Sequence, residues 1–311
     1  MGQPDSTAHQ LRRIRTVAII TTVGLCVLVV AGGVVRLTGS GLGCDDWPNC
    51  NSERFVDVSS GHTAIEQINR LLSGALGIPT LVLAFLAYRT RGTALGARRL
   101  WWPSLGVLVT VVANGVVGGV AVRGDLHPAL IQSHFLLAMV SIACGLFVVS
   151  RTGQVDNAPT TPSIGRLVGV LAALTAMALV TGTVVTGTGP HAGDEDIRRF
   201  GFDISTVARV HSVTVLVTLV VALLVAARAR SGSGDQERIG ALLSGWIFVG
   251  VLQGGIGYVQ YFNGVPELLV GTHIAAATLL WVLTVLLLTR TLTVVKSRTR
   301  PTITTGVLES A

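Results

Sequence analysis

Hydrophobic residues gather into eight runs of about 20 residues along this chain of 311 residues. The runs cover roughly 16–35, 64–88, 101–122, 129–150, 166–187, 205–227, 239–261 and 268–290. A helix of about 20 apolar residues spans the hydrocarbon core of a bilayer. Half of the residues are hydrophobic and only 13% are charged, which is more apolar than a soluble core of this size needs. The pattern therefore predicts an all-α integral membrane protein with eight transmembrane helices.

Charge marks one side of this predicted membrane protein. The formal net charge of +7 would by itself suggest a nucleic-acid partner. Of the 23 basic residues, however, 16 lie before the first run, after the last run or in every second loop, and the opposite loops contain five. Because basic loops remain on the cytoplasmic side, the distribution predicts that both termini are cytoplasmic. The excess of basic charge is then an orientation signal, and we expect no nucleic-acid partner.

The sequence contains two copies of one unit. "NGVVGGVAVRGDLHPALIQSHFLLA" (114–138) resembles "QGGIGYVQYFNGVPELLVGTHIAAA" (253–277), and "EQINRLLSG" (66–74) occupies the place of "ARVHSVTVL" (208–216). Four helices per unit give both halves the same orientation, unlike the inverted repeats of many transporters. The first run also resembles a signal peptide, but its counterpart in the second half indicates that it belongs to the protein. We predict two pseudo-symmetric four-helix bundles, in 1–150 and 167–295, with a cytoplasmic linker at 151–166 and a tail at 296–311.

Three histidines lie inside the predicted helices at one depth. His134, His211 and His273 are each five to seven residues from the outer end of an even-numbered run, and Asn69 is at that depth in the second run. At 1.5 Å per residue this is about 7–10 Å below the helix ends. A single histidine there is as often a polar residue that joins helices. Three together indicate a functional site, because ionisable groups are costly in a membrane.

The residue types at this depth favour a haem over a zinc ion. His211 and His273 belong to one predicted bundle and can place imidazoles on both faces of a porphyrin. Zinc needs three or four ligands, and the sequence offers no cysteine or acid at that level. Arg70 and Arg209 at the outer helix ends can bind haem propionates, or extend to lipid headgroups.

The first outer loop contributes two further candidates. Cys44 and Cys50 flank "DDWPN" on the predicted outer side, where a disulfide persists, although two free thiols remain the alternative. Glu66, at the start of the second run, is four residues before Arg70 and can pair with it.

In this order, the stretches "VVRLTGSGLGCDDWPNC", "AIEQINRLLSG", "QSHFLLA", "RVHS" and "GTHIAAATLLW" resemble the heme A synthase family, over about 16–290. The resemblance implies a haem-dependent membrane oxidoreductase that converts heme O into heme A. The porphyrin C8 methyl becomes a formyl by successive hydroxylations, and the product serves cytochrome c oxidase. It also implies a multi-pass protein of the bacterial plasma membrane. Its expected partners are heme O, membrane lipid, an electron donor, heme O synthase and assembly factors of cytochrome c oxidase.

The resemblance also assigns residues. It implies that the C-terminal bundle holds haem b between His211 and His273, and that the N-terminal bundle binds heme O through His134 with Glu66 as catalytic residue. Cys44 and Cys50 match the family's paired loop cysteines, which implies a Cys44–Cys50 disulfide.

Asn69 departs from the family pattern, because the motif has a histidine at this position in Glu-xx-His-Arg. We expect the substrate iron to have His134 as its only protein ligand. The alternative is that His62, one turn before Glu66, reaches the iron. Two other functions compete: a bis-His cytochrome b for electron transfer only, which leaves Glu66 and the cysteines without a role, and a transporter with histidines as proton relays.

Overall fold

The computed structural model describes residues 3–153, 160–191, 193, 197–231 and 234–292. Within these residues it has eight α-helices, one 3-10 helix and no strand. The helices are α1 (Gln3–Leu37), α2 (Gly61–Arg89), α3 (Trp101–Arg123), α4 (Pro128–Thr152), α5 (Pro162–Thr188), α6 (Ile204–Ser231), α7 (Asp235–Phe262) and α8 (Glu267–Leu292), with the 3-10 helix η1 (Ala94–Arg98) between α2 and α3. All eight α-helices are long and apolar enough to cross a membrane. The predicted fold class is therefore confirmed.

The helix bounds differ from the apolar runs mainly at the ends. The first helix begins at Gln3 instead of about residue 16, because its polar and basic lead continues the same helix. Helix α4 continues to Thr152 and α5 begins at Pro162, so the segment between them is shorter than the predicted linker 151–166. Part of that linker, residues 154–159, and the predicted tail 296–311 lie outside the described residues.

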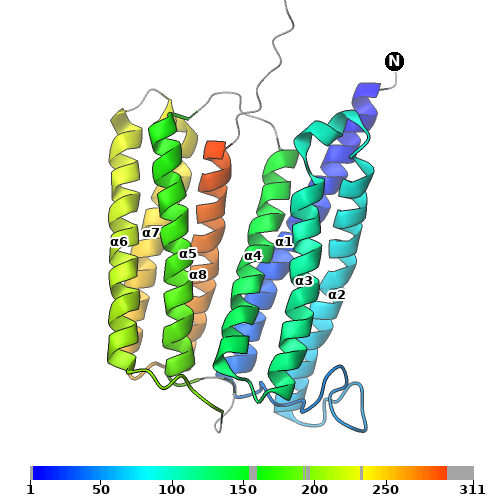
Figure 1. The fold of residues 1–311 in the computed structure, drawn as a ribbon, viewed down its shortest axis with the longest axis vertical. Coiled ribbons are helices and arrows are strands. Elements are labelled where there is room, and N and C mark those ends of the chain that lie inside the picture. The colour runs from blue at the N-terminus through cyan, green and yellow to red at the C-terminus, as the bar shows by residue number, and fades with distance from the viewer. Residues whose placement is uncertain (1–2, 154–159, 192, 194–196, 232–233, 293–311) are drawn as a thin grey trace, which may run out of the picture.

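The helices form two bundles that stand side by side, α1–α4 and α5–α8 (Figure 1). Within the first bundle α1 and α3 each pack against both α2 and α4, so α2 and α4 are diagonally opposite. In the second bundle α5 and α7 each pack against both α6 and α8, which makes α6 and α8 the diagonal pair. The even-numbered helices that carry the three histidines therefore face one another across the bundle interiors.

The seam between the bundles is formed by α1 and α4 on one side and α5 and α8 on the other. Trp281 of α8 donates its indole N–H to the backbone oxygen of Met139 on α4, at 2.8 Å. An apolar groove of about 670 Å³ runs along the seam between α1, α4 and α8. None of the three intramembrane histidines lines this groove, so it is distinct from the site that they indicate.

The apolar core of the C-terminal bundle lies away from its histidines. Its centre is Trp246, which is 1% exposed and donates its indole N–H to the Thr284 hydroxyl at 2.7 Å. The buried members of this cluster are Ile164, Val168, Leu171, Ala222, Val225, Ala229, Ile239, Leu243, Trp246 and Leu287. All of them lie toward the helix ends opposite His211 and His273. This core holds the bundle together and leaves its other end for a polar site.

Candidate functional site

The three intramembrane histidines occupy equivalent places. His134, His211 and His273 are six, seven and six residues into α4, α6 and α8. Each ring packs its Cε1–Nδ1 edge against a glycine of the preceding helix, in the pairs Gly118–His134, Gly182–His211 and Gly257–His273. A Cβ atom on these glycines would lie 3.1, 3.1 and 3.2 Å from the imidazole Cε1. Glycine is therefore the residue that lets the edge of each imidazole approach the neighbouring helix closely.

The Nδ1 atoms of the three rings differ in their partners. Nδ1 of His211 forms a 3.0 Å hydrogen bond with the Thr181 hydroxyl, while Nδ1 of His134 and of His273 are buried without a hydrogen bond. In metal-binding histidines one nitrogen is oriented by a hydrogen bond and the other coordinates the metal. His211 has this arrangement, because its Nδ1 is hydrogen-bonded and its Nε2 is the nitrogen that can coordinate a metal.

The polar residues of the C-terminal bundle fit a haem held between two helices. His211 and His273 belong to the diagonal pair α6 and α8. Gln253 of α7 donates from Nε2 to the backbone oxygen of His273 at 2.9 Å, which ties α7 to α8. Its Oε1 is buried without a partner. An unpaired buried polar atom is costly. Gln253 Oε1 and His273 Nδ1 are both unpaired here, which points to a bound group that would contact them.

The N-terminal bundle has the same layout with one imidazole fewer. Asn69 on α2 and His134 on α4 form its diagonal pair. Asn69 Oδ1 and Asn114 Oδ1 are, like His134 Nδ1, buried without a hydrogen bond among the described residues. Gly33 of α1, in the place of Gly182, faces Ile274 of α8 instead of Asn69. Of the four equivalent positions, the one at Asn69 is therefore the one that lacks a contact between a glycine and a histidine.

His62 lies away from this depth. It is the second residue of α2, seven residues before Asn69, and its side chain is exposed. Its Nδ1 forms a 3.0 Å hydrogen bond with the Ser40 hydroxyl of the α1–α2 loop. The structure does not bring His62 together with His134, and its role as an alternative iron ligand stays a prediction.

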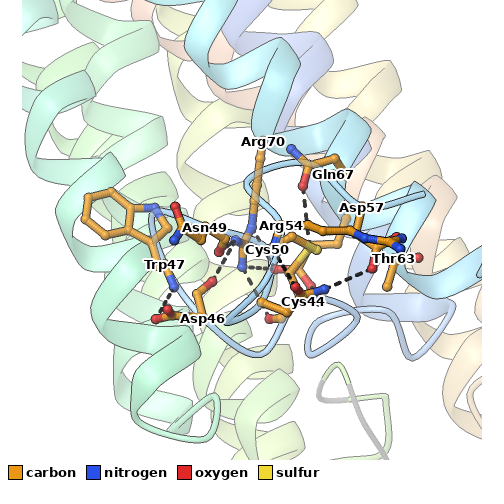
Figure 2. Close-up of a disulfide and its surroundings, with 12 residues drawn as sticks. Cys44, Asp46, Trp47, Asn49, Cys50, Arg54, Asp57, Thr63, Gln67 and Arg70 are labelled. Carbon is orange, nitrogen blue, oxygen red and sulfur yellow. Dashed lines mark hydrogen bonds and ion pairs between the residues drawn. A yellow bond between two sulfur atoms is a disulfide. The ribbon is translucent and has the colours of Figure 1, made fainter. Parts of the chain in front are cut away.

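Arg70 and Glu66 of α2 hold the first outer loop (Figure 2). The guanidinium of Arg70 donates from Nε and Nη2 to Glu66 Oε1, at 3.0 and 2.6 Å. Its remaining bonds go to backbone oxygens of the loop, to Asp46 at 2.8 Å, Asn49 at 3.0 Å and Cys44 at 3.3 Å. Five bonds use the five N–H donors of an arginine. A bond from Arg70 to a haem propionate, which stays a prediction, would require one of these to be given up.

Glu66 is 5% exposed, and both of its carboxylate oxygens are hydrogen-bonded. Oε1 accepts from Arg70, and Oε2 accepts from the backbone N–H of Cys44 at 2.7 Å. This arrangement corresponds to the alternative interpretation of Glu66 as the partner of Arg70. The catalytic role of Glu66 stays a prediction.

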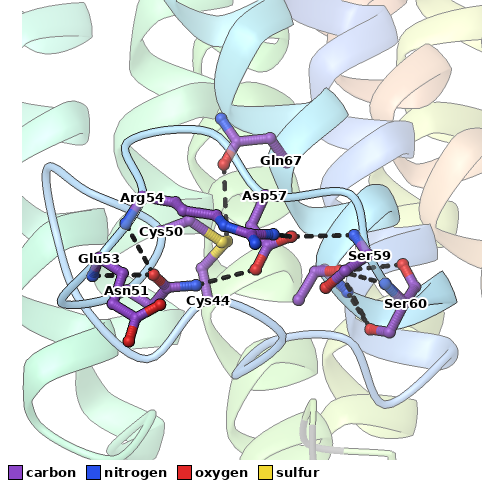
Figure 3. Close-up of polar contacts among 10 residues, drawn as sticks. Cys44, Cys50, Asn51, Glu53, Arg54, Asp57, Ser59, Ser60 and Gln67 are labelled. Carbon is purple, nitrogen blue, oxygen red and sulfur yellow. Dashed lines mark hydrogen bonds and ion pairs between the residues drawn. A yellow bond between two sulfur atoms is a disulfide. The ribbon is translucent and has the colours of Figure 1, made fainter.

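The predicted disulfide is present between Cys44 and Cys50. Both cysteines are fully buried, and Gln67 Oε1 of α2 lies 3.6 Å from Cys44 Sγ. The chain beyond Cys50 is folded back by Asn51 and Asp57, whose side chains are joined by a 2.9 Å hydrogen bond (Figure 3). The disulfide thus lies at the centre of a closed loop that covers the outer end of α2.

A second arginine attaches the same loop to α3. Arg123 donates from Nη2 to the backbone oxygen of Trp47 and forms a 3.3 Å ion pair with Asp46. The backbone N–H of Trp47, and to a lesser extent Arg123, lower the pKa of the Asp46 carboxyl below its ordinary value. Asp46 is therefore charged at neutral pH, as the ion pair requires.

Arg209 differs from Arg70. It lies on α6 two residues before His211, is exposed, and makes no hydrogen bond or ion pair within the described part of the chain. Binding of a haem propionate by Arg209 stays a prediction, and its guanidinium is available for that contact.

Comparison with known proteins identifies the family. The family model described as cytochrome oxidase assembly protein (COX15-CtaA) matches residues 15–59 and 55–193, which is more than half of the chain. The chain belongs to this family. It is 32% identical over 147 residues to the heme A synthase of Bacillus mycoides (strain KBAB4), and 31% identical over 147 residues to those of Bacillus cereus (strain AH187) and Bacillus anthracis (strain A0248). Each match covers 47% of this chain and 46% of the relative, so the chain spans about half the length of these relatives.

The family match includes the loop cysteines, Glu66, Asn69 and His134, and it ends before His211. The place of the chain in the family therefore rests on its N-terminal bundle and the start of α5. The interpretation of His211 and His273 rests on the internal repeat and on their packing.

Two residues were missed in the sequence, Trp47 of the α1–α2 loop and Gly119 of α3. A Cβ atom on Gly119 would lie 2.5 Å from Trp47 Cδ2, so the indole of Trp47 lies directly on α3. The pair Gly118–Gly119 was the available signal. Gly118 corresponds to Gly257 of the second half, but Gly119 corresponds to Tyr258. A glycine in place of an aromatic residue indicates that another group fills the space.

Proposed function

We propose that this protein is a heme A synthase, which oxidises the C8 methyl of heme O to a formyl by successive hydroxylations. One observation carries the proposal: the two bundles share one arrangement of buried polar residues, with two imidazoles in one bundle and a single imidazole in the other. Two imidazoles suit a resident cofactor. One imidazole suits a substrate that must bind, react and leave. The names of the relatives support the reaction.

In this proposal haem b is the resident cofactor of the C-terminal bundle. His211 and His273 would hold it from α6 and α8, with the glycines beside their rings leaving room for a flat group. Bound there, haem b supplies one-electron transfer. The Thr181 hydroxyl orients the His211 ring through Nδ1, and Arg209 is placed to pair with a propionate at the outer end of α6.

Heme O is the proposed substrate of the N-terminal bundle. His134 would bind its iron from α4, and Asn69 faces it from the diagonal helix. An amide is a poor iron ligand compared with imidazole, so the iron would have one strong protein ligand and one open side. The unpaired Oδ1 atoms of Asn69 and Asn114 can bind polar groups or water beside it.

The proposed location is the bacterial plasma membrane, with both termini in the cytoplasm. The distribution of basic residues supports this orientation. Both sites would then lie toward the outer surface, and the Cys44–Cys50 disulfide would be in an oxidising compartment, where disulfides persist.

The function is tested by expressing the chain together with a heme O synthase and extracting the haems from the purified protein. We expect heme A or its hydroxylated precursor in addition to haem b. Folded protein that carries haem b alone would reject the synthase and favour the cytochrome that only transfers electrons. A protein without any Soret band would reject both.

The role of Glu66 can be separated from the function itself. Glu66→Ala removes the charged partner of the partly buried Arg70, whose three bonds to loop oxygens remain, so we expect a loss of about 1–3 kcal/mol in the stability of the loop region, retention of haem b and no conversion of heme O. Glu66→Gln keeps the shape of the side chain and one oxygen acceptor, for either Arg70 or the Cys44 N–H, and removes the charge. Conversion by Glu66→Gln at a few per cent of wild type or less, with a wild-type melting temperature, would indicate a role in proton transfer. Near-normal conversion would leave Glu66 as a positioning residue.

A further inference from the structure

We infer that Trp47 is a positioning residue for the macrocycle in the N-terminal bundle, where its indole forms a wall of the substrate site. The inference rests on the proposed function and names a residue that this function does not yet use. It starts from the contact between the Trp47 indole and Gly119, which links the α1–α2 loop to α3.

Trp47 lies at the depth of the predicted iron ligand. Its indole packs against Gly119, and the preceding residue on α3, Gly118, packs against the ring of His134. Successive residues of a helix differ in height by about 1.5 Å. The indole and the imidazole therefore contact α3 at one level, from two directions about 100° apart around the helix axis.

The loop that carries Trp47 is bound to both α2 and α3. On either side of Trp47, the backbone oxygens of Asp46 and Asn49 accept hydrogen bonds from Arg70 of α2, at 2.8 and 3.0 Å. On the other side, Arg123 of α3 donates to the backbone oxygen of Trp47 itself. Figure 2 shows Trp47 on one side of the loop and Gln67 of α2 on the other. The backbone on both sides of the indole is thus held from both helices.

The second half of the chain fills the equivalent position with an aromatic ring of its own. Tyr258 of α7 stands in the place of Gly119, and its hydroxyl forms a 2.7 Å hydrogen bond with Ser212, the residue after His211. Both bundles therefore have an aromatic ring at this position of their third helix. In the N-terminal bundle this ring comes from a loop and not from the helix itself. Its position can therefore adjust to a ligand that binds and leaves.

A flat, apolar macrocycle is the ligand that suits such a wall. Aromatic rings pack against one another by offset stacking or edge contacts, and indole offers the largest face. Trp47 would fix the rotation of the porphyrin in the site, and hence which edge of the ring meets the reacting position. His134 fixes only the iron.

The test measures binding of zinc protoporphyrin IX, which takes one axial ligand, to the full-length protein with haem b already in its C-terminal bundle. We expect Trp47→Leu to weaken binding about tenfold and Trp47→Phe to stay within about threefold of wild type, because Phe keeps an aromatic face. Gly119→Ala should weaken binding about as much as Trp47→Leu, because its Cβ displaces the indole. The matched control, Tyr258→Leu in the other bundle, should leave probe binding unchanged.

The double variant distinguishes a wall from a general effect on folding. If Gly119 acts through Trp47, then Gly119→Ala adds no further loss in the Trp47→Leu background. Fully additive losses would overturn the inference. Wild-type affinity in Trp47→Leu would also overturn it, provided that His134→Ala abolishes probe binding. If the wild-type protein shows no His134-dependent binding at all, the proposed substrate site itself is wrong, and the inference is rejected with it.

Discussion

The two bundles use one helix arrangement for two different polar sites. The C-terminal bundle has imidazoles on both diagonal helices, at His211 and His273, while the N-terminal bundle has Asn69 opposite His134. The N-terminal bundle also has the disulfide loop at the start of α2, held by seven hydrogen bonds that involve Glu66, Arg70 and Arg123 and by the Cys44–Cys50 disulfide. One exchanged side chain and one added loop therefore distinguish the two bundles, and in the proposed function they separate the site of a permanent ligand from the site of a transient one.

The largest expected effect is the loss of the resident cofactor. His211→Ala or His273→Ala removes one of two axial ligands, so we expect complete loss of the low-spin haem b spectrum. His134→Ala is the matched control in the other bundle and should keep that spectrum while abolishing conversion of heme O. Low-spin haem b that persists in both C-terminal variants would refute the assignment.

A second prediction is to make the bundles alike. Asn69→His restores the imidazole that the family motif has at this position, and we expect a second low-spin haem signal in place of the high-spin one, because both faces of the substrate iron are then occupied. Absorption spectroscopy of the protein loaded with heme O checks this. A substrate haem that stays high-spin in Asn69→His would contradict the comparison.

The sequence predicted the helices well and the loop poorly, for physical reasons. Eight apolar runs and the spacing of His134, His211 and His273 determine the helices and the common depth, because helix rise is regular. The contacts of Arg70 depend on where three backbone oxygens of a loop lie, which no periodicity encodes. Glu66 and Arg70 four residues apart on one helix did signal an ion pair, which the structure contains. The indole of Trp47 is placed by tertiary contacts alone.

A smaller effect is expected from the disulfide. Replacing both Cys44 and Cys50 by serine opens a loop of seven residues, and we expect a loss of about 2 kcal/mol in stability. Arg70 and Arg123 still hold the loop, so conversion should fall only partly and haem b should be unaffected. Thermal melting of the purified protein measures the first effect. Loss of haem b in this variant would mean that the loop supports both bundles.

The smallest effect is expected from Asn69→Ala. The amide is not an iron ligand in this account, and its Oδ1 has no hydrogen bond in the protein. We expect conversion to fall by less than about threefold, measured with the same extraction of haems. Complete loss, with Glu66 and His134 intact, would make Asn69 an essential part of the substrate site.

The most direct test of the difference between the bundles is the spin state of the haems in the purified protein loaded with heme O. We predict two signals: a low-spin signal that is lost in His211→Ala and in His273→Ala, and a high-spin signal that is lost only in His134→Ala. Two low-spin signals, or one signal that depends on all three histidines, would contradict the account.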